Sequence, residues 1–198
     1  MNARIAARMA APPVSAAVVE RDTAKNRFAR VFVTGTPDYD HEVLLTYRGR
    51  DGAPGVDLLT PMRIAGQDTA ILVNRGWVYS PDGSTIERGR WRESAASFSG
   101  YLDAFDSAPG DTVRDGRIRR ASYQAIARVM PYPIQPFYVV ALGDSAKQAD
   151  SARAPVQVAR LERPKLDEGP HLSYAFQWFG FATIAVIGAA VVAARSMR

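Results

Sequence analysis

The 198-residue sequence contains no cysteine and only two histidines, His41 and His171. Without cysteine the chain cannot form disulfides, thiolate metal sites, a cysteine nucleophile or a Cys-x-x-Cys-His haem attachment. Two histidines are too few for a multi-histidine zinc or di-iron site. The sequence also lacks the His-Glu-x-x-His, P-loop, Gly-x-Gly-x-x-Gly and Gly-x-Ser-x-Gly motifs. We therefore expect a protein that is not an enzyme.

The charge of the chain is close to balanced, with 25 basic and 20 acidic residues and a formal net charge of +5. Part of the surplus lies in one short run of arginines, Arg114, Arg117, Arg119 and Arg120. A surplus of this size does not indicate nucleic-acid binding. The length allows one globular core and one or two membrane elements.

One long uncharged stretch lies near the C-terminus. Residues 171–194 contain no Asp, Glu, Lys or Arg, and residues 176–194 are almost wholly apolar. About 20 such residues in a helix cross a hydrocarbon core of about 30 Å. Tyr174 and Trp178 lie where aromatic residues meet lipid headgroups, and Arg195 follows the apolar run. We predict a transmembrane helix over residues 170–195 and a cytoplasmic tail of residues 196–198.

Residues 1–26 form an alanine-rich segment that we expect to be membrane-proximal. Arg4, Arg8 and the Pro12-Pro13 pair interrupt any apolar run long enough for a membrane span or for a signal peptide. Two expectations are open: a tail-anchored cytoplasmic domain, or a chain that starts downstream of a first membrane helix. Basic residues on both sides of the predicted helix leave the orientation undecided by charge.

Residues 27–168 have the pattern of a soluble, mainly β domain. Runs of β-branched and aromatic residues alternate with Gly, Pro and Asp turns. We predict strands at residues 27–35, 41–47, 56–64, 69–79, 97–105, 137–142 and 156–161, and a helix at residues 121–130 that the following prolines end. The fold class is α+β, mainly β: an antiparallel sheet or small barrel-like domain with a short helix, then one C-terminal transmembrane helix.

The link formed by Ala65-Gly66-Gln67-Asp68 predicts an antiparallel hairpin between two of these strands. Strict alternation would then place four side chains of the second strand on one face: Ile71, Val73, Arg75 and Trp77.

The start of the predicted membrane helix carries a histidine and two aromatic residues. On a helix, His171, Tyr174 and Trp178 lie on one stripe. A neutral imidazole beside aromatic rings can ligate haem iron and support a porphyrin, but an interfacial histidine and two anchoring aromatics explain the same spacing. The stripe continues with small residues that predict a partner helix, Ala182, Ala185 and Ala189.

Two further motifs each allow two interpretations. In Asn74-Arg75-Gly76-Trp77, a glycine within a strand indicates a bulge or a close backbone approach, and an exposed arginine near tryptophan could stack on the ring or hold a carboxylate. The alternative is a purely structural motif. The arginine run of residues 114–120 could contact lipid phosphates or haem propionates, or form a solvated loop.

The chain resembles the Surfeit locus protein 1 family in four motifs that occur in the family's order. They are Pro54-Gly55, Thr60-Pro61, Val73-Asn74-Arg75-Gly76-Trp77-Val78 and His171-Leu172-Ser173-Tyr174-Ala175-Phe176-Gln177-Trp178-Phe179. The likeness covers residues 27–194, and two long motifs in order are more specific than any single pattern. Family members have two membrane helices, so the resemblance favours a start downstream of the first one.

The resemblance implies a membrane-anchored assembly factor for cytochrome c oxidase that binds haem a transiently and assists its insertion into subunit I. By motif match, His171 is the axial ligand of the haem iron, with Tyr174 and Trp178 beside it. The implied partners are oxidase subunit I, haem a synthase and membrane lipid, but not nucleic acid. The implied location is a bacterial or mitochondrial inner membrane, with the domain on the periplasmic or intermembrane side. A cofactor-free scaffold for an oxidase intermediate and a tail-anchored adaptor are the alternatives.

Overall fold

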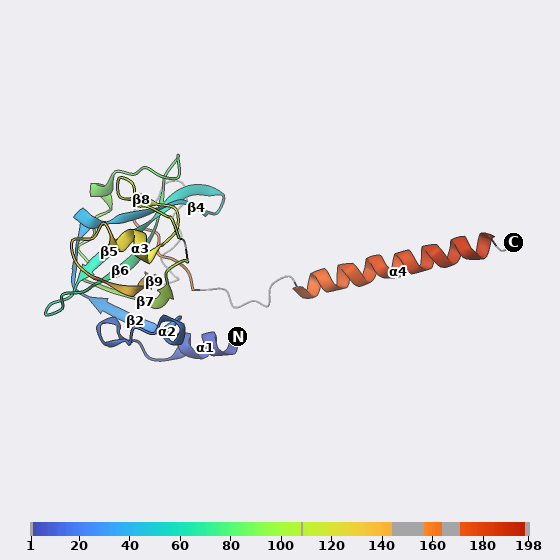
Figure 1. Cartoon of the computed structure of the whole chain (residues 1–198), viewed down its shortest axis with the longest axis horizontal. Coiled ribbons are helices and arrows are strands. Elements are labelled where there is room, and N and C mark those ends of the chain that lie inside the picture. The colour runs from blue at the N-terminus through green and yellow to red at the C-terminus, as the bar shows by residue number, and fades with distance from the viewer. Residues whose placement is uncertain (1, 108, 144–156, 164–170, 197–198) are drawn as a thin grey trace. The chain divides into compact units, whose positions relative to one another are not determined.

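The computed structural model describes residues 2–107, 109–143, 157–163 and 171–196 (Figure 1). The chain divides into two units, Ala3–Pro164 and Lys165–Arg198, the second together with Met1 and Asn2. The first unit is a sheet domain, and the second contains the helix α4 (His171–Ser196).

The domain is built on one nine-stranded sheet. Its strands are β1 (Val14–Ser15), β2 (Arg30–Thr34), β3 (Thr36–Pro37), β4 (Val43–Arg50), β5 (Ala53–Arg63), β6 (Ala70–Tyr79), β7 (Ser97–Ala104), β8 (Arg117–Ile118) and β9 (Ile134–Ala141). Their order is β1-β2-β7-β9-β6-β5-β4-β8, and β3 pairs with β5. The pairs β1/β2, β6/β9 and β4/β8 are parallel and the rest antiparallel. The α+β, mainly β prediction is confirmed, with a mixed rather than purely antiparallel sheet.

Short helices connect and flank the strands. They are α1 (Asn2–Ala10), η1 (Ala16–Val18), α2 (Thr23–Asn26), η2 (Tyr39–His41), η3 (Arg88–Trp91) and α3 (Tyr123–Ala127). The helix predicted at residues 121–130 is present as the shorter α3, which Ser122 caps by accepting a hydrogen bond from the backbone N–H of Ala125. Ile5 and Met9 of α1 pack against Tyr101 and Val140, so the N-terminal segment contributes to the domain's packing.

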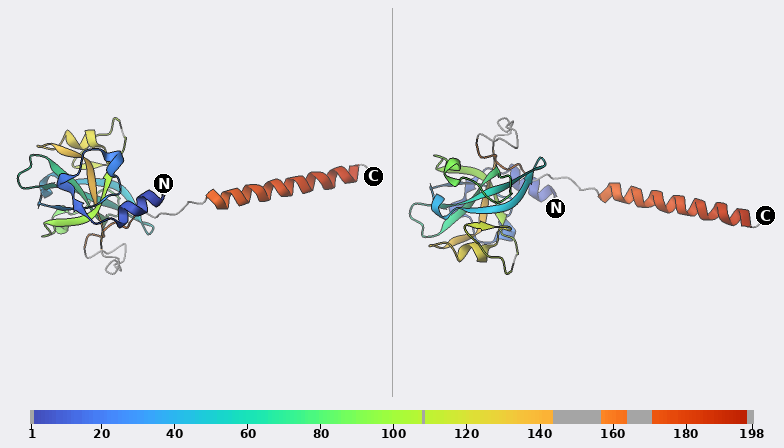
Figure 2. Two further views of the ribbon diagram at one scale, coloured as in Figure 1. Left: turned by 90° about the horizontal axis from the view of Figure 1, so that it is seen from below. Right: turned by 90° about the horizontal axis from the view of Figure 1, so that it is seen from above.

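The sheet is curved (Figure 2). Alternation along its strands places apolar side chains on both faces. On β6, Ile71 and Val73 belong to one buried cluster, which includes Val31 and Phe137. Leu72 belongs to a second cluster beneath α3. Because β6 is buried on both faces, it is the central strand of the domain and reads as a nearly continuous apolar run.

The predicted strands differ from the observed ones mainly at the two ends of the domain. The hairpin through residues 65–68 is present as β5 and β6, in antiparallel register. Residues 157–161 form no strand; two isolated bridges hold them, from Trp77 to Ala159 and from Leu142 to Leu161. Residue 156, the first of that predicted strand, lies outside the described residues.

Candidate functional site

A bulge interrupts β6 within the Asn74-Arg75-Gly76-Trp77 motif. Asn74 pairs with Leu59 and Trp77 pairs with Asp57, so two residues of β6 lie opposite Leu58 alone. The extra residue moves Trp77 to the opposite face from Arg75. The prediction that Ile71, Val73, Arg75 and Trp77 share one face is therefore wrong for Trp77, although the bulge that the glycine indicated is present.

Gly76 lets a distant segment of the chain approach the bulge. Its φ is +133°, and a Cβ at this position would lie 2.3 Å from the carbonyl oxygen of Ala159. The backbone N–H of Trp77 donates to Ala159 O at 2.8 Å, and the N–H of Ala159 donates to Trp77 O at 3.0 Å. Only glycine fits both the conformation and the space.

The Pro54-Gly55 motif contacts the same bulge on the face of the hairpin that carries Trp77, opposite to Arg75. A Cβ on Gly55 would lie 2.3 Å from the indole of Trp77. The indole N–H donates to Arg48 O at 2.9 Å, and the ring is buried. Two motifs that are separate in sequence thus form one packing unit.

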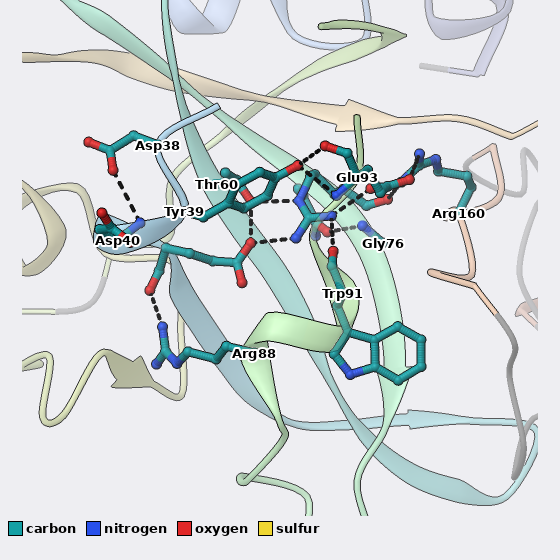
Figure 3. Close-up of polar contacts among 12 residues, drawn as sticks. Asp38, Tyr39, Asp40, Thr60, Gly76, Arg88, Trp91, Glu93 and Arg160 are labelled. Atoms are coloured by element: carbon teal, nitrogen blue, oxygen red, sulfur yellow. Dashed lines mark hydrogen bonds and ion pairs between the residues drawn. The ribbon is translucent and has the colours of Figure 1, made fainter. Parts of the chain in front are cut away.

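Arg75 is fully buried and has its charge neutralised inside the domain. Three of the residues that accept its hydrogen bonds, Thr60, Trp91 and Glu93, are seen in Figure 3. Arg75 Nε donates to Thr60 Oγ1 at 2.7 Å and its Nη2 to Glu42 Oε2 at 2.6 Å. Its Nη1 donates to Trp91 O at 2.8 Å and to Glu93 Oε2 at 2.5 Å. The motif arginine therefore holds two carboxylates of its own chain and is buried, not exposed as the sequence interpretation assumed.

A second arginine extends this network towards the segment of residues 157–163. Arg160 Nη1 donates to Arg75 O at 2.5 Å and to Glu93 Oε2 at 3.1 Å, and its Nη2 pairs with Glu93 Oε1. Tyr39 closes the other side: its hydroxyl donates to Glu93 O at 2.6 Å, and its ring lies 5.0 Å from the Arg75 guanidinium carbon. Arg75, Glu93 and Arg160 thus tie β6 to the part of the domain that precedes α4 in sequence.

The electrostatics of the bulge differ on its two faces. Burial lowers the pKa of Arg75, but Glu42 and Glu93 outweigh it, so the pKa is raised and the guanidinium stays charged. On the face of Trp77, burial raises the pKa of Asp57 above its usual value, although Asn74 Nδ2 donates to it at 3.2 Å and Arg48 lies nearby. One face of the bulge therefore holds a charged arginine, and the other holds an acid whose charged form is disfavoured by burial.

A hollow of about 540 Å³ lies beside this network. It is lined in part by Tyr39, His41, Arg88 and Met130. His41 Nδ1 lies 2.8 Å from Asp38 Oδ2, which also accepts from the hydroxyl of Tyr132 at 2.6 Å. Burial raises the pKa of Asp38, but these two hydrogen bonds outweigh it and lower the pKa overall. His41 is thus engaged within its own loop.

The helix α4 begins at His171, the residue that the sequence pointed to. Tyr174 and Trp178 follow on the same helix with 56% and 71% of their surface exposed. The side chain of His171 lies outside the described residues. Residues 174–196 are long and apolar enough to cross a membrane, with a mean hydropathy of 1.8. The three residues therefore share one helix, and haem binding by them stays a prediction.

Within the described ranges, no group of three His, Asp or Glu side chains could hold a metal ion. The residues that complete the Arg75 network were not singled out from the sequence, apart from Thr60 of the Thr60-Pro61 pair. Glu42, Glu93 and Arg160 have no local signal, because a charged residue in a loop or at a strand end looks the same whether or not a remote arginine pairs with it.

Together, the sheet domain and a helix able to cross a membrane define a membrane-anchored protein. The model of the SURF1 family matches residues 1–183. The chain belongs to the SURF1 family. It is 29% identical, over 184 residues, to uncharacterized SURF1-like proteins of Mycobacterium bovis and of two strains of Mycobacterium tuberculosis. The match covers 87% of this chain and 62% of each relative, so the chain spans under two thirds of their length.

Proposed function

We propose that the protein is an assembly factor for cytochrome c oxidase that holds haem a at the membrane surface and assists its insertion into subunit I. The observation that carries the proposal is that α4 begins at His171, in a chain of the SURF1 family. The family motif places a histidine at the entrance of a membrane helix, and this chain has both the residue and the helix.

The residues at the start of α4 suit haem a as a cargo. Haem iron needs an axial nitrogen ligand, which a neutral His171 imidazole can supply. The porphyrin needs apolar cover, and the exposed rings of Tyr174 and Trp178 lie on the next two turns. A single protein ligand keeps affinity moderate, so that the cargo can be released to the oxidase.

The sheet domain would dock on oxidase subunit I or on haem a synthase, at a bacterial or mitochondrial inner membrane. In this scheme the domain lies on the periplasmic or intermembrane side, where haem a is inserted. Arg75 and Trp77 support docking indirectly, because both are buried and fix the shape of β6 rather than contact a partner. Delivery of this kind needs no catalytic residue.

The test compares the two histidines of the chain. The full chain is expressed with haem a available, purified in detergent, and its Soret absorbance measured beside the His171→Ala and His41→Ala forms. We expect His171→Ala to lose most of the bound haem. His41→Ala should retain it, since His41 is held by Asp38 in the domain. Equal retention in all three proteins would remove the iron-ligand role from His171.

A cofactor-free scaffold is the rival function, and the small residues of α4 favour it. Ala182, Ala185 and Ala189 are exposed on this helix and would let a helix of an oxidase intermediate approach closely. The scaffold predicts that Ala185→Phe blocks oxidase assembly in cells while His171→Ala does not. The haem-delivery proposal predicts that His171→Ala impairs oxidase assembly more than Ala185→Phe does.

A further inference from the structure

A hollow of about 360 Å³ lies beside β8, on the far side of β4 from β5. Three arginines line it: Arg114, Arg117 and Arg119. Tyr47 of β4 and the hydroxyl-bearing Ser84 also line it, and Asp115 is its one acidic residue. These residues, here called the arginine hollow, do not belong to the Arg75 network or to α4.

The arginine hollow carries more positive charge than its own carboxylate neutralises. Arg117 Nη2 lies 3.3 Å from Asp115 Oδ2, and that carboxylate is largely exposed. In the part of the chain that the structure describes, Arg114 and Arg119 have no carboxylate partner. Three guanidinium groups around one hollow match the oxygens of a phosphate, because each can donate two parallel hydrogen bonds.

Tyr47 is held at this hollow in an unfavourable backbone conformation. Its φ is +58°, in the left-handed region that glycine and asparagine favour, yet 64% of the residue is exposed. A register shift between Leu45 and Arg48 and a 2.7 Å hydrogen bond from Tyr47 N–H to Gly83 O fix it there. The Arg119 guanidinium carbon lies 5.7 Å from its ring centroid. Strain at an exposed aromatic residue points to a functional rather than a packing role.

We propose that the arginine hollow binds the phosphate of an anionic phospholipid headgroup, with Tyr47 as the aromatic contact at its edge. Lipid is the source of phosphate because the same chain contains a helix able to cross a membrane. Basic side chains are attracted to anionic leaflets, and tyrosine is enriched at the headgroup level. The inference does not depend on haem binding.

The test counts the lipids that the full chain retains. The protein is purified in a mild detergent, mixed with phosphatidylglycerol and phosphatidylcholine, and analysed by native mass spectrometry. Arg114→Gln and Arg119→Gln should each lower phosphatidylglycerol affinity about fivefold, the typical value for one arginine near an anionic surface. Lipid bound along α4 is common to all variants and cancels in the comparison.

The matched control is Arg120→Gln, which removes the same charge from a neighbouring residue. Arg120 already pairs with Asp111, through contacts of 3.1 Å from Nε and from Nη2. This variant should retain phosphatidylglycerol like the original chain. If all three arginine variants lose phosphatidylglycerol affinity equally, the effect is one of net charge and the proposed site is wrong. The site is also wrong if the original chain retains phosphatidylglycerol and phosphatidylcholine equally.

Two further measurements separate the ligand and the role of Tyr47. Tyr47→Gly keeps the three arginines but removes the aromatic contact, so it should weaken phosphatidylglycerol binding. Because glycine adopts the positive φ without strain, the unfolding temperature should not fall. Unchanged lipid binding would remove Tyr47 from the site. Inorganic phosphate is titrated in parallel, and we expect it to bind far more weakly than phosphatidylglycerol. If it binds as well as the lipid, the ligand is a soluble phosphate and the lipid assignment fails.

Discussion

The domain contains two groups of arginines that are used in opposite ways. Arg75 is fully buried and holds Glu42 and Glu93 of its own chain. Arg114 and Arg119 line an open hollow and hold no carboxylate among the described residues. The arginine of the Val73–Val78 motif therefore has its charge neutralised by its own chain, whereas charge without a described carboxylate partner lies in the arginine run, which matches no family motif. The family motif around Arg75 therefore fixes the architecture of the domain and does not offer this arginine for contact with a partner.

Substitution of Arg75 should have the largest effect. Arg75→Met leaves the Glu42 carboxylate buried without its partner, so we expect the free energy of unfolding to fall by about 3–5 kcal/mol. The measurement is denaturant unfolding of the full chain in detergent, followed by near-ultraviolet circular dichroism. Arg119→Gln is the comparison and should change the same free energy by less than about 0.5 kcal/mol. If both variants lose a similar free energy of unfolding, the distinction between a structural Arg75 and an arginine run with no structural role is wrong.

Closing the space at Gly76 should have the next largest effect. Gly76→Ala places a Cβ against Ala159 O in a backbone conformation that disfavours alanine, so we expect a loss of about 1–3 kcal/mol. Hydrogen exchange should become faster at the amides of Trp77 and Ala159, which pair across this contact. Gly89→Ala is the control, because a Cβ added there would have no atom within 4 Å. Unchanged exchange at both amides would mean that the contact does not depend on Gly76.

The smallest effect should come from Asp57, the buried acid on the other face of the bulge. Burial raises its pKa in the folded domain above the unfolded value, so the folded state holds the proton more tightly. The stability from this group is present below the unfolded pKa and is lost as the pH rises through the folded pKa. Asp57→Asn should remove that decline and be more stable than the original chain at neutral pH. Urea unfolding of both proteins at acid and neutral pH measures this. If the free energy of unfolding changes with pH by the same amount in Asp57→Asn and in the original chain, the prediction is wrong.

The strands could be predicted where local alternation decides the structure. β5 and β6 have the right pattern and a short turn between them, so both the pair and its register follow from neighbouring residues. The strand predicted at residues 27–35 begins only at Arg30, because Phe28 has a φ of +66°. No propensity or alternation pattern signals a left-handed phenylalanine, since this conformation depends on contacts with the rest of the domain.

The candidate site could be predicted only in part, because its key contacts are long-range. The glycine of the motif correctly indicated a bulge, but the flip of Trp77 to the other face depends on which residue of β5 lies opposite. The burial of Arg75 depends on Glu42 and Glu93, which lie 33 and 18 residues away. At the entrance of α4, the helix and its spacing follow from the sequence, whereas haem binding stays a prediction.

The pairing of Arg160 with the backbone of Arg75 spans 85 residues. A ribosome releases the β5 and β6 hairpin long before residue 160, so the nascent sheet meets Arg160 only when translation reaches the residues that precede α4. The domain therefore gains this contact only shortly before the residues of α4 are synthesised. A chain that stalls before that point would hold Glu93 through Arg75 alone, without the second arginine that ties this network to residues 157–163.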